Sequence, residues 1–249
     1  MNGTLATRSV QVAFIAIVGV AWYFATKTGS ISALFLPPLD AVWNTFTRLV
    51  QTPQFWSAVR VTLMTIAQAW AIAVVVGILV AYLVTRSKFL MAVFEPVISA
   101  TFAIPLTLLF PVFILFFGIG PNSKIAYAAT YGFFPVALST IAGLSAVDQL
   151  YLRSARSMGA SGFDTLRHVL FPAAFPVILT GLRVSFFISF ASVLGGETLS
   201  SAAGVGKAIA LAAELMESAR MYAWIVFVIC ITVMLNFTVS AFENSRREY

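Results

Sequence analysis

Side chains able to carry out catalysis are scarce in this sequence. The dipeptide Gly206–Lys207 is the end of the pattern found in phosphate-binding loops, which hold the phosphates of a nucleotide. Such a loop also needs glycine five positions before Gly206 and serine or threonine after Lys207, and the sequence has Ser201 and Ala208 there. We therefore expect that the chain is not an enzyme, has no catalytic residue and does not hydrolyse ATP itself.

A metal centre would also lack its ligands. The sequence holds one histidine, His168, and one cysteine, Cys230, on separate segments. These are too few for a metal cluster or an internal disulfide. Cys230 lies within an apolar run, where a free cysteine behaves as a small packing residue. We expect no metal and no cofactor in this chain.

One stretch, from Arg153 to Pro172, combines polar residues with helix signals: "RSARSMGASGFDTLRHVLFP". Two apolar stripes at helical spacing flank Gly159, a residue type that commonly ends a helix. This pattern predicts two short helices joined by a Gly-Ala-Ser-Gly elbow and closed by Pro172. Helices of about ten residues are not stable alone in water, so the stripes must be buried partly against this chain and partly against another protein. The stripes are Leu152, Ala155 and Met158, and Phe163, Leu166 and Leu170.

The segments on either side of this stretch are apolar enough to cross a membrane. Of the 249 residues, 60% are hydrophobic and 10% are charged, whereas soluble domains carry about a quarter charged residues. Blocks of about 20 apolar residues are what a bilayer requires of a helix. We predict an all-α integral membrane protein, a single transmembrane domain over residues 1–249 with six helices that contact membrane lipid. The predicted spans are 10–26, 61–84, 89–117, 125–147, 173–194 and 221–242.

The basic residues indicate the orientation. With six spans the two termini lie on one side, together with 86–88 and 148–172. These segments carry eight Lys and Arg residues in 43 positions, against six in 66 for the segments on the other side. Cytoplasmic segments carry the excess of Lys and Arg, so both termini and 148–172 are predicted to be cytoplasmic. The net charge of +6 does not indicate nucleic-acid binding, because the basic residues form neither a run nor a face.

Three further patterns concern packing and the outer side. Residues 36–60 predict a short amphipathic surface helix, and 195–220 a partly inserted turn and helix at the outer mouth. Ala73, Gly77 and Ala81, spaced by four, predict a close helix contact. Prolines in the third and fourth spans remove helix hydrogen bonds, which leaves two alternatives, kinks that only shape the bundle or a translocation path. These prolines are Pro96, Pro105, Pro111 and Pro135.

The stretch at 148–172 resembles the cytoplasmic EAA loop of ABC-importer permeases, E-A-A-x3-G-x9-I-x-L-P. Ala155 fits the third position, Gly159 the glycine and Pro172 the proline, with Val169 and Phe171 in place of isoleucine and leucine. The sequence departs from the motif at Arg153, where glutamate is expected, and at Ser154. Segments such as "FAIPLTLLFPVFILFFGIGPNSKI" and "GETLSSAAGVGKAI" resemble the taurine, sulfonate and nitrate branch, so the resemblance covers about residues 30 to 245.

The resemblance implies a type I ABC importer permease fold in a bacterial or archaeal inner membrane. Residues 148–172 would form a coupling helix in a groove of an ATPase subunit, present in two copies, which binds the ATP and Mg. A second copy of the permease would complete a homodimer, and an extracytoplasmic solute-binding protein would deliver a small anion such as a sulfonate, taurine or nitrate. The expected contact residues are Ala155, Met158, Gly159, Ala160, Ser161, Phe163, Leu166 and Pro172.

Polar and aromatic residues in or near the spans are candidates for the pathway or its gate. Arg183 could attract an anionic substrate, contact Glu95, or reach the membrane surface with its long side chain. Glu197 could belong to an outer gate or cap the inserted turn. The alternative function, an ion-coupled secondary transporter, would need intramembrane carboxylates, and Glu95 is the one candidate. The pathway or gate candidates are Thr107, Phe110, Ser139, Arg183, Ser185 and Glu197.

Overall fold

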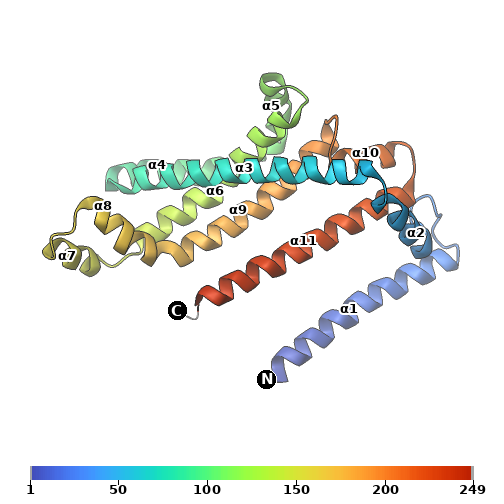
Figure 1. The fold of residues 1–249 in the computed structure, drawn as a ribbon, viewed down its shortest axis with the longest axis horizontal. Helices are drawn as coiled ribbons and strands as arrows, with labels where there is room; N and C mark the ends of the chain where they lie inside the picture. Colours follow the sequence, from blue (N-terminus) through green and yellow to red (C-terminus); the bar gives the residue numbers. More distant parts are fainter. Residues whose placement is uncertain (1, 248–249) are drawn as a thin grey trace.

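The computed structural model describes the backbone of residues 2–247 and the side chains of residues 10, 11 and 13–238. In this part of the chain all regular structure is helical, as expected (Figure 1). The helices are α1 (Asn2–Lys27), α2 (Leu39–Val50), α3 (Pro53–Thr85), α4 (Lys88–Phe102), α5 (Phe110–Phe117), α6 (Pro121–Ser145), α7 (Gln149–Ser157), α8 (Gly162–Thr165), α9 (Phe171–Leu199), α10 (Val205–Glu214) and α11 (Ser218–Arg247). A 3₁₀ turn, Leu106–Leu109, precedes α5, and a π turn, Leu166–Leu170, joins α8 to α9.

The described residues contain four or five candidate membrane spans instead of six. Four helices are long and apolar enough to cross a bilayer: α3, α6, α8 continued through α9, and α11. The fifth candidate is α4 together with the turn and helix at Leu106–Phe117, which are bent by 80° at a break. The predicted first span, 10–26, lies in α1, whose described apolar part, Ala13–Lys27, is shorter than the length that a span requires. Five of the six predicted spans thus correspond to candidate spans in the structure, and the span 10–26, part of which lies outside the residues with described side chains, stays a prediction.

The break in the predicted span 89–117 lies at Pro105, which has no N–H to donate to a helix and disfavours a helical conformation in the residue before it. Pro111 lies in the first turn of α5, where proline is tolerated. By contrast, Pro96 and Pro135 lie inside α4 and α6, which continue through them. The predicted span 89–117 is therefore not one straight helix but a candidate broken span, because Pro105 and the turn after it redirect the chain.

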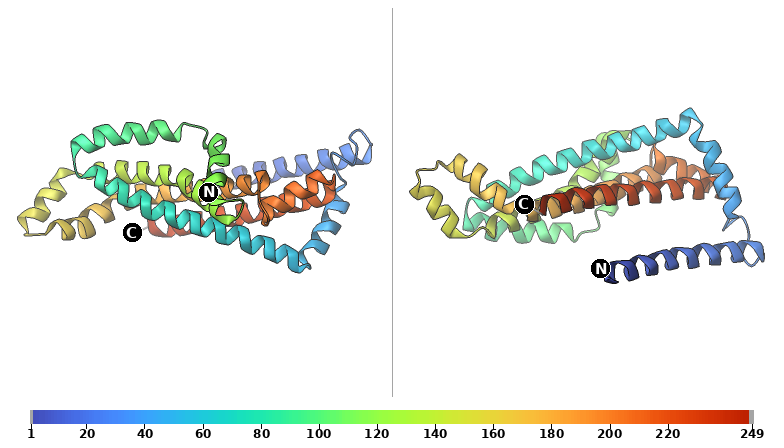
Figure 2. Two further views of the ribbon diagram at one scale, coloured as in Figure 1. Left: turned by 90° about the horizontal axis from the view of Figure 1, so that it is seen from above. Right: turned by 60° about the horizontal axis from the view of Figure 1, so that its bottom comes forward.

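The helix α1 runs beside the bundle, as two views show (Figure 1, Figure 2). Its C-terminal part is attached to the segment before α2, because the indole Nε1 of Trp22 donates a hydrogen bond of 2.9 Å to the carbonyl oxygen of Pro37. The Trp22 ring also packs edge-on against Tyr222 of α11, with 5.2 Å between ring centroids. Most described side chains of the apolar part of α1 are exposed, so bilayer or another chain must cover them.

The core forms where α6 packs between α3 and α9. The small residues Ala73 and Ala81 of α3 are buried, and a Cβ atom on Gly77 would lie 2.8 Å from Cβ of Val136 on α6. On the other side of α6, a Cβ on Gly181 of α9 would lie 2.4 Å from Cβ of Ser139. The predicted close contact at Ala73, Gly77 and Ala81 is confirmed, and α9 approaches α6 just as closely.

The two ends of the bundle carry different short helices. The amphipathic surface helix predicted within 36–60 is α2, which follows Pro38 and buries Val42 and Leu49. At the same end the segment 195–220 turns back after Leu199 and forms α10, whereas α7 and α8 lie at the opposite end (Figure 1). The segment 148–172 and the predicted outer segments therefore lie at opposite ends, as expected.

The contact between α6 and α9 predicts the effect of Gly181→Ala. The new methyl group would lie 2.7 Å from the carbonyl oxygen of Pro135 and 2.4 Å from Cβ of Ser139, and neither atom belongs to a flexible chain end. Overpacking of this kind destabilises by about 1–3 kcal/mol, so we expect a lower midpoint of thermal unfolding in detergent.

Gly19→Ala is the matched control, because no atom lies within 4 Å of a Cβ atom on Gly19 in α1. Its midpoint should equal or exceed that of the unchanged protein. Equal midpoints for the two variants would contradict the close packing of α9 on α6.

Candidate functional site

The elbow between α7 and α8 begins with a specific helix stop at Gly159. Its backbone has φ of +80°, the left-handed region that side chains with a Cβ rarely adopt. The N–H of Ala160 donates to the carbonyl of Ala155 at 3.0 Å, and the N–H of Gly159 donates to the carbonyl of Arg156 at 3.0 Å. This pair of bonds is the Schellman arrangement, which occupies carbonyls left free at a helix end. The stop that the sequence predicts at Gly159 is confirmed.

The next helix starts two residues later, at Ser161. The hydroxyl of Ser161 accepts a hydrogen bond from the N–H of Asp164, and the carboxylate of Asp164 accepts one from the N–H of Ser161, both at 3.2 Å. This reciprocal pair is a capping box, which satisfies two N–H groups at the helix start. A stop and a start with so few residues between them leave the elbow little conformational freedom.

The segment after the elbow continues directly into the membrane. The helical stretch Gly162–Leu199 has 38 residues without a break and includes the π turn, in which the N–H of Phe171 donates to the carbonyl of Leu166. Pro172 lies in the first turn after it, where a missing N–H is tolerated. The prediction that Pro172 closes a separate short helix is therefore wrong, because the helical stretch continues from α8 through the π turn into α9.

The elbow before this helical stretch exposes apolar side chains. Met158 is 87% exposed and Phe163 is 66% exposed, one on each side of the elbow. Both lie in the part of the chain that projects past the ends of α3 and α4 (Figure 1). Exposed apolar groups of this size on a projecting tip indicate a contact site for a partner.

The eight predicted contact residues differ in exposure. Ala155 is buried against the chain itself, so it supports the elbow from inside. Ala160 and Leu166 are half-buried, and the others are exposed: Met158, Gly159, Ser161, Phe163 and Pro172. Their contact with a partner stays a prediction.

At the other end of the helical stretch Gly162–Leu199, Glu197 lies in a buried polar cluster. Glu197 is 2% exposed, and its two carboxylate oxygens lie 2.9 and 2.8 Å from the hydroxyl of Thr62 on α3. One of them also accepts a hydrogen bond of 2.9 Å from the N–H of Gly206, in the first turn of α10. Thr62 in turn accepts from the N–H of Val205 at 2.8 Å. Glu197 therefore caps the inserted helix α10, one of the two roles considered for it, and its part in an outer gate stays a prediction.

A second buried charge, Lys124, lies close to this cluster at the start of α6. Its side chain is 1% exposed and donates to the carbonyl oxygens of Ile119 and Gly120, in the turn between α5 and α6. It lies 5.9 Å from the ring centre of Phe110, one of the pathway candidates. A buried cation needs several partners, and Lys124 finds them in the turn before α6. Lys124 and Glu197 therefore each hold a turn at this end of the bundle.

The other pathway candidates do not converge on one place. Thr107 is exposed on the 3₁₀ turn, Ser139 packs against Gly181, and Ser185 is fully buried opposite Gly132. Arg183 donates a hydrogen bond of 2.7 Å to the side-chain oxygen of Asn236 on α11. Glu95, the partner considered for Arg183, is exposed on α4. A lining role for these residues stays a prediction.

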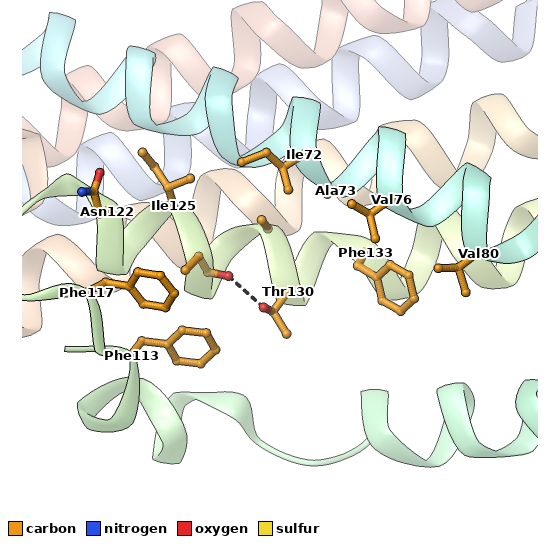
Figure 3. Close-up of a pocket in the computed structure, with 12 residues that line it drawn as sticks. Ile72, Ala73, Val76, Val80, Phe113, Phe117, Asn122, Ile125, Thr130 and Phe133 are labelled. Atoms are coloured by element: carbon orange, nitrogen blue, oxygen red, sulfur yellow. Dashed lines mark hydrogen bonds between the residues drawn. The ribbon is translucent and has the colours of Figure 1, made fainter. Parts of the chain in front are cut away.

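A hollow lies elsewhere, between α3, α5 and α6. It has a volume of about 730 Å³, and Figure 3 shows Phe113 and Phe117 of α5 facing Ile125 and Thr130 of α6 across it. Its lining is almost entirely apolar, with Asn122 and Thr130 as polar exceptions, and it includes none of the six pathway candidates. In the sequence, the one residue that could have indicated this hollow is Pro105. The chain bends there, so α5 runs in a different direction from α4.

Comparisons with known proteins give one consistent result. Residues 73–247 match the family described as "Binding-protein-dependent transport system inner membrane component". The chain is 28% identical to the taurine transport system permease protein TauC of Escherichia coli over 95% of this chain and 88% of the relative. It is 27% identical to the putative aliphatic sulfonates transport permease protein SsuC of Bacillus subtilis over 85% of this chain and 76% of the relative.

A solved structure shares the fold. The inward-facing MetNI methionine ABC transporter contains a chain that matches with a TM-score of 0.67 at 18% identity. The match covers 78% of this chain and 98% of that one. At this identity the likeness concerns the fold alone.

The buried cluster predicts the effect of Glu197→Ala. The substitution would leave the N–H of Gly206 and the hydroxyl of Thr62 without their carboxylate acceptor inside the protein. Such a loss costs about 1–3 kcal/mol or more, so amide hydrogen exchange in 205–214 should become at least about fivefold faster.

Glu214→Ala removes an exposed carboxylate from the same helix and should leave the exchange rates near their original values. Similar exchange in the two variants would show that Glu197 does not hold α10.

Proposed function

Because the chain belongs to the inner membrane components of binding-protein-dependent transport systems, we propose that its elbow segment, residues 148–172, receives the motion of a separate ATP-hydrolysing subunit. The protein is a multi-pass inner membrane protein and the non-catalytic permease subunit of an ABC importer. Importers of this family work with an ATPase and a binding protein. The ATP and Mg belong to the ATPase, in two copies, and a second copy of this chain completes the membrane part.

One observation carries the proposal: the helical stretch from Gly162 to Leu199 runs without a break from the elbow into the membrane helix. Coupling between distant sites requires an element whose position both partners can bias. A force on Met158 is passed through the capped elbow to α8, a force on Phe163 acts on α8 directly, and both then reach the contacts of α9 with α6. At the far end, hydrogen bonds of Glu197 connect α9 to α3 and α10. Movement at the tip would therefore reach the opposite mouth.

This geometry supports alternating access in a type I importer fold. The elbow end would face the cytoplasm, with both termini on that side, and the end with α2 and α10 would face the binding protein. The excess of Lys and Arg in the segments 1–9, 86–88, 148–172 and 244–249 supports this orientation. Membranes of bacteria and archaea contain such importers.

The substrate is proposed from the relatives. TauC and SsuC are named for taurine and aliphatic sulfonates, so we propose a small anion of the sulfonate, taurine or nitrate class. The pathway would run between two copies of this chain, and its selectivity depends also on the binding protein. The ion-coupled carrier is not favoured, because Glu197 is already bound to Thr62 and Gly206, and Glu95 is exposed.

The elbow predicts different effects for two substitutions at Gly159. A left-handed backbone costs residues with a Cβ about 1–2 kcal/mol, and β-branched residues adopt it least, whereas asparagine visits it readily. No atom lies within 4 Å of a Cβ atom on Gly159, so the difference would arise from the backbone alone. We expect Gly159→Val to abolish most permease-dependent ATP hydrolysis and solute uptake, and Gly159→Asn to retain them.

Both variants should insert in the membrane, with Gly159→Asn unfolding close to the temperature of the original chain and Gly159→Val lower by no more than the strain at its elbow explains. Full coupling in Gly159→Val would remove the support for the elbow as the contact with the ATPase. Loss in both variants would mean that the partner excludes any side chain at this position.

A further inference from the structure

The exposed face of α7 carries positive charge that the chain itself does not balance. Arg153 and Arg156 are three residues apart and both exposed, so their side chains are neighbours on the helix surface. Among the described residues no ion pair or hydrogen bond involves either guanidinium group. The two acids of this segment are already used, Asp148 by the N–H of Leu150 and Asp164 by Ser161.

We propose that the ATPase surface that receives the elbow is an apolar groove with carboxylate side chains on its rim, placed opposite Arg153 and Arg156. This inference rests on the proposed function and adds the chemistry of the partner surface. Met158 and Phe163 would enter the groove, since they are the large apolar groups beside the elbow. The arginines precede Met158 on α7, on a different face of the helix, and we place them at the rim.

Charge complementarity carries the argument. An arginine that loses water at an interface without a counter-charge weakens binding, whereas a carboxylate opposite it strengthens binding and speeds association. Two unbalanced arginines beside an apolar tip therefore select a partner with acidic side chains at this place. An ATPase with basic side chains there would be repelled, so the same charges also provide specificity. Arg153 stands where the EAA motif has glutamate. A glutamate at this place would need a basic residue on the ATPase, whereas Arg153 needs an acidic one.

Anionic lipid headgroups are the other negatively charged surface at this end of the protein. The tip projects past the turn that joins α3 to α4 (Figure 1, Figure 2). That turn carries its own basic residues, Arg86 and Lys88, at the bundle end. The arginines of α7 therefore project farther from the bundle than Arg86 and Lys88 do. This position favours contact with a protein over contact with lipid headgroups.

The test measures the affinity of the ATPase subunit for the full-length permease in nanodiscs of neutral phosphatidylcholine. Arg153→Glu and Arg156→Glu should each weaken binding about tenfold or more, and the dependence of binding on salt should be smaller than in the original chain. Lys88→Glu is the matched control, because it makes the same change of charge at the same end, outside the segment, and should leave the affinity unchanged. Met158→Ala should weaken binding without changing the salt dependence.

A second measurement keeps the test independent of folding. Replacing one rim carboxylate of the ATPase by lysine should restore binding to Arg153→Glu and weaken binding to the original chain. Unchanged affinity in both arginine variants would overturn the inference, and so would a loss seen only in discs that contain anionic phosphatidylglycerol, which would assign the arginines to lipid. If the original chain itself failed to bind the ATPase, the proposed function would fail instead.

Discussion

The architecture depends on how closely α6 can approach the helices on either side of it. In a bilayer there is no water to drive helices together, so close packing must supply the attraction. Gly77, Gly132 and Gly181 remove the side chains that would separate α3, α6 and α9, and a methyl group on any of them would meet an atom at 2.8 Å or less. The resulting three-helix core holds α9 against a fixed support. Without that support a force applied at one end of α9 would bend the helix instead of displacing it.

The two ends of the helical stretch Gly162–Leu199 are specified by different kinds of interaction. At the elbow the bonds are local: a left-handed glycine, a serine and an aspartate within six positions form the stop and the next start. At the opposite end they are distant, since Thr62 and Glu197 are 135 residues apart. Local bonds define a shape that survives when the surroundings move, whereas the distant ones hold separate helices together. This division is what the proposed coupling requires, since the elbow would keep its form while its position changes.

The same difference explains which features could be predicted from the sequence. The elbow was predictable because Gly159 ends a helix by its own backbone, and the amphipathic α2 because Val42 and Leu49 share one face. The partner of Glu197 could not be predicted, since nothing near it in the sequence indicates Thr62.

The bend at Pro105 was missed because a proline within an apolar block predicts either a kink or a break, and Pro96 and Pro135 lie in helices that continue through them. The hollow lined by Phe113 and Phe133 follows from that bend, so it was missed as well. Pro172 was misread as an end because the π turn before it lets the helix continue.

The π turn at Leu166–Leu170 has a geometric consequence of its own. A π turn accommodates one residue more than the same length of α-helix, and each residue of an α-helix corresponds to a rotation of about 100° about the axis. Everything before Leu166 is therefore turned, relative to the faces of α9 that touch α6, by a large angle that a regular helix would not give. The direction in which Met158 and Phe163 point is set by this single extra residue, and shortening the turn by one position would aim the tip at a different side of the molecule.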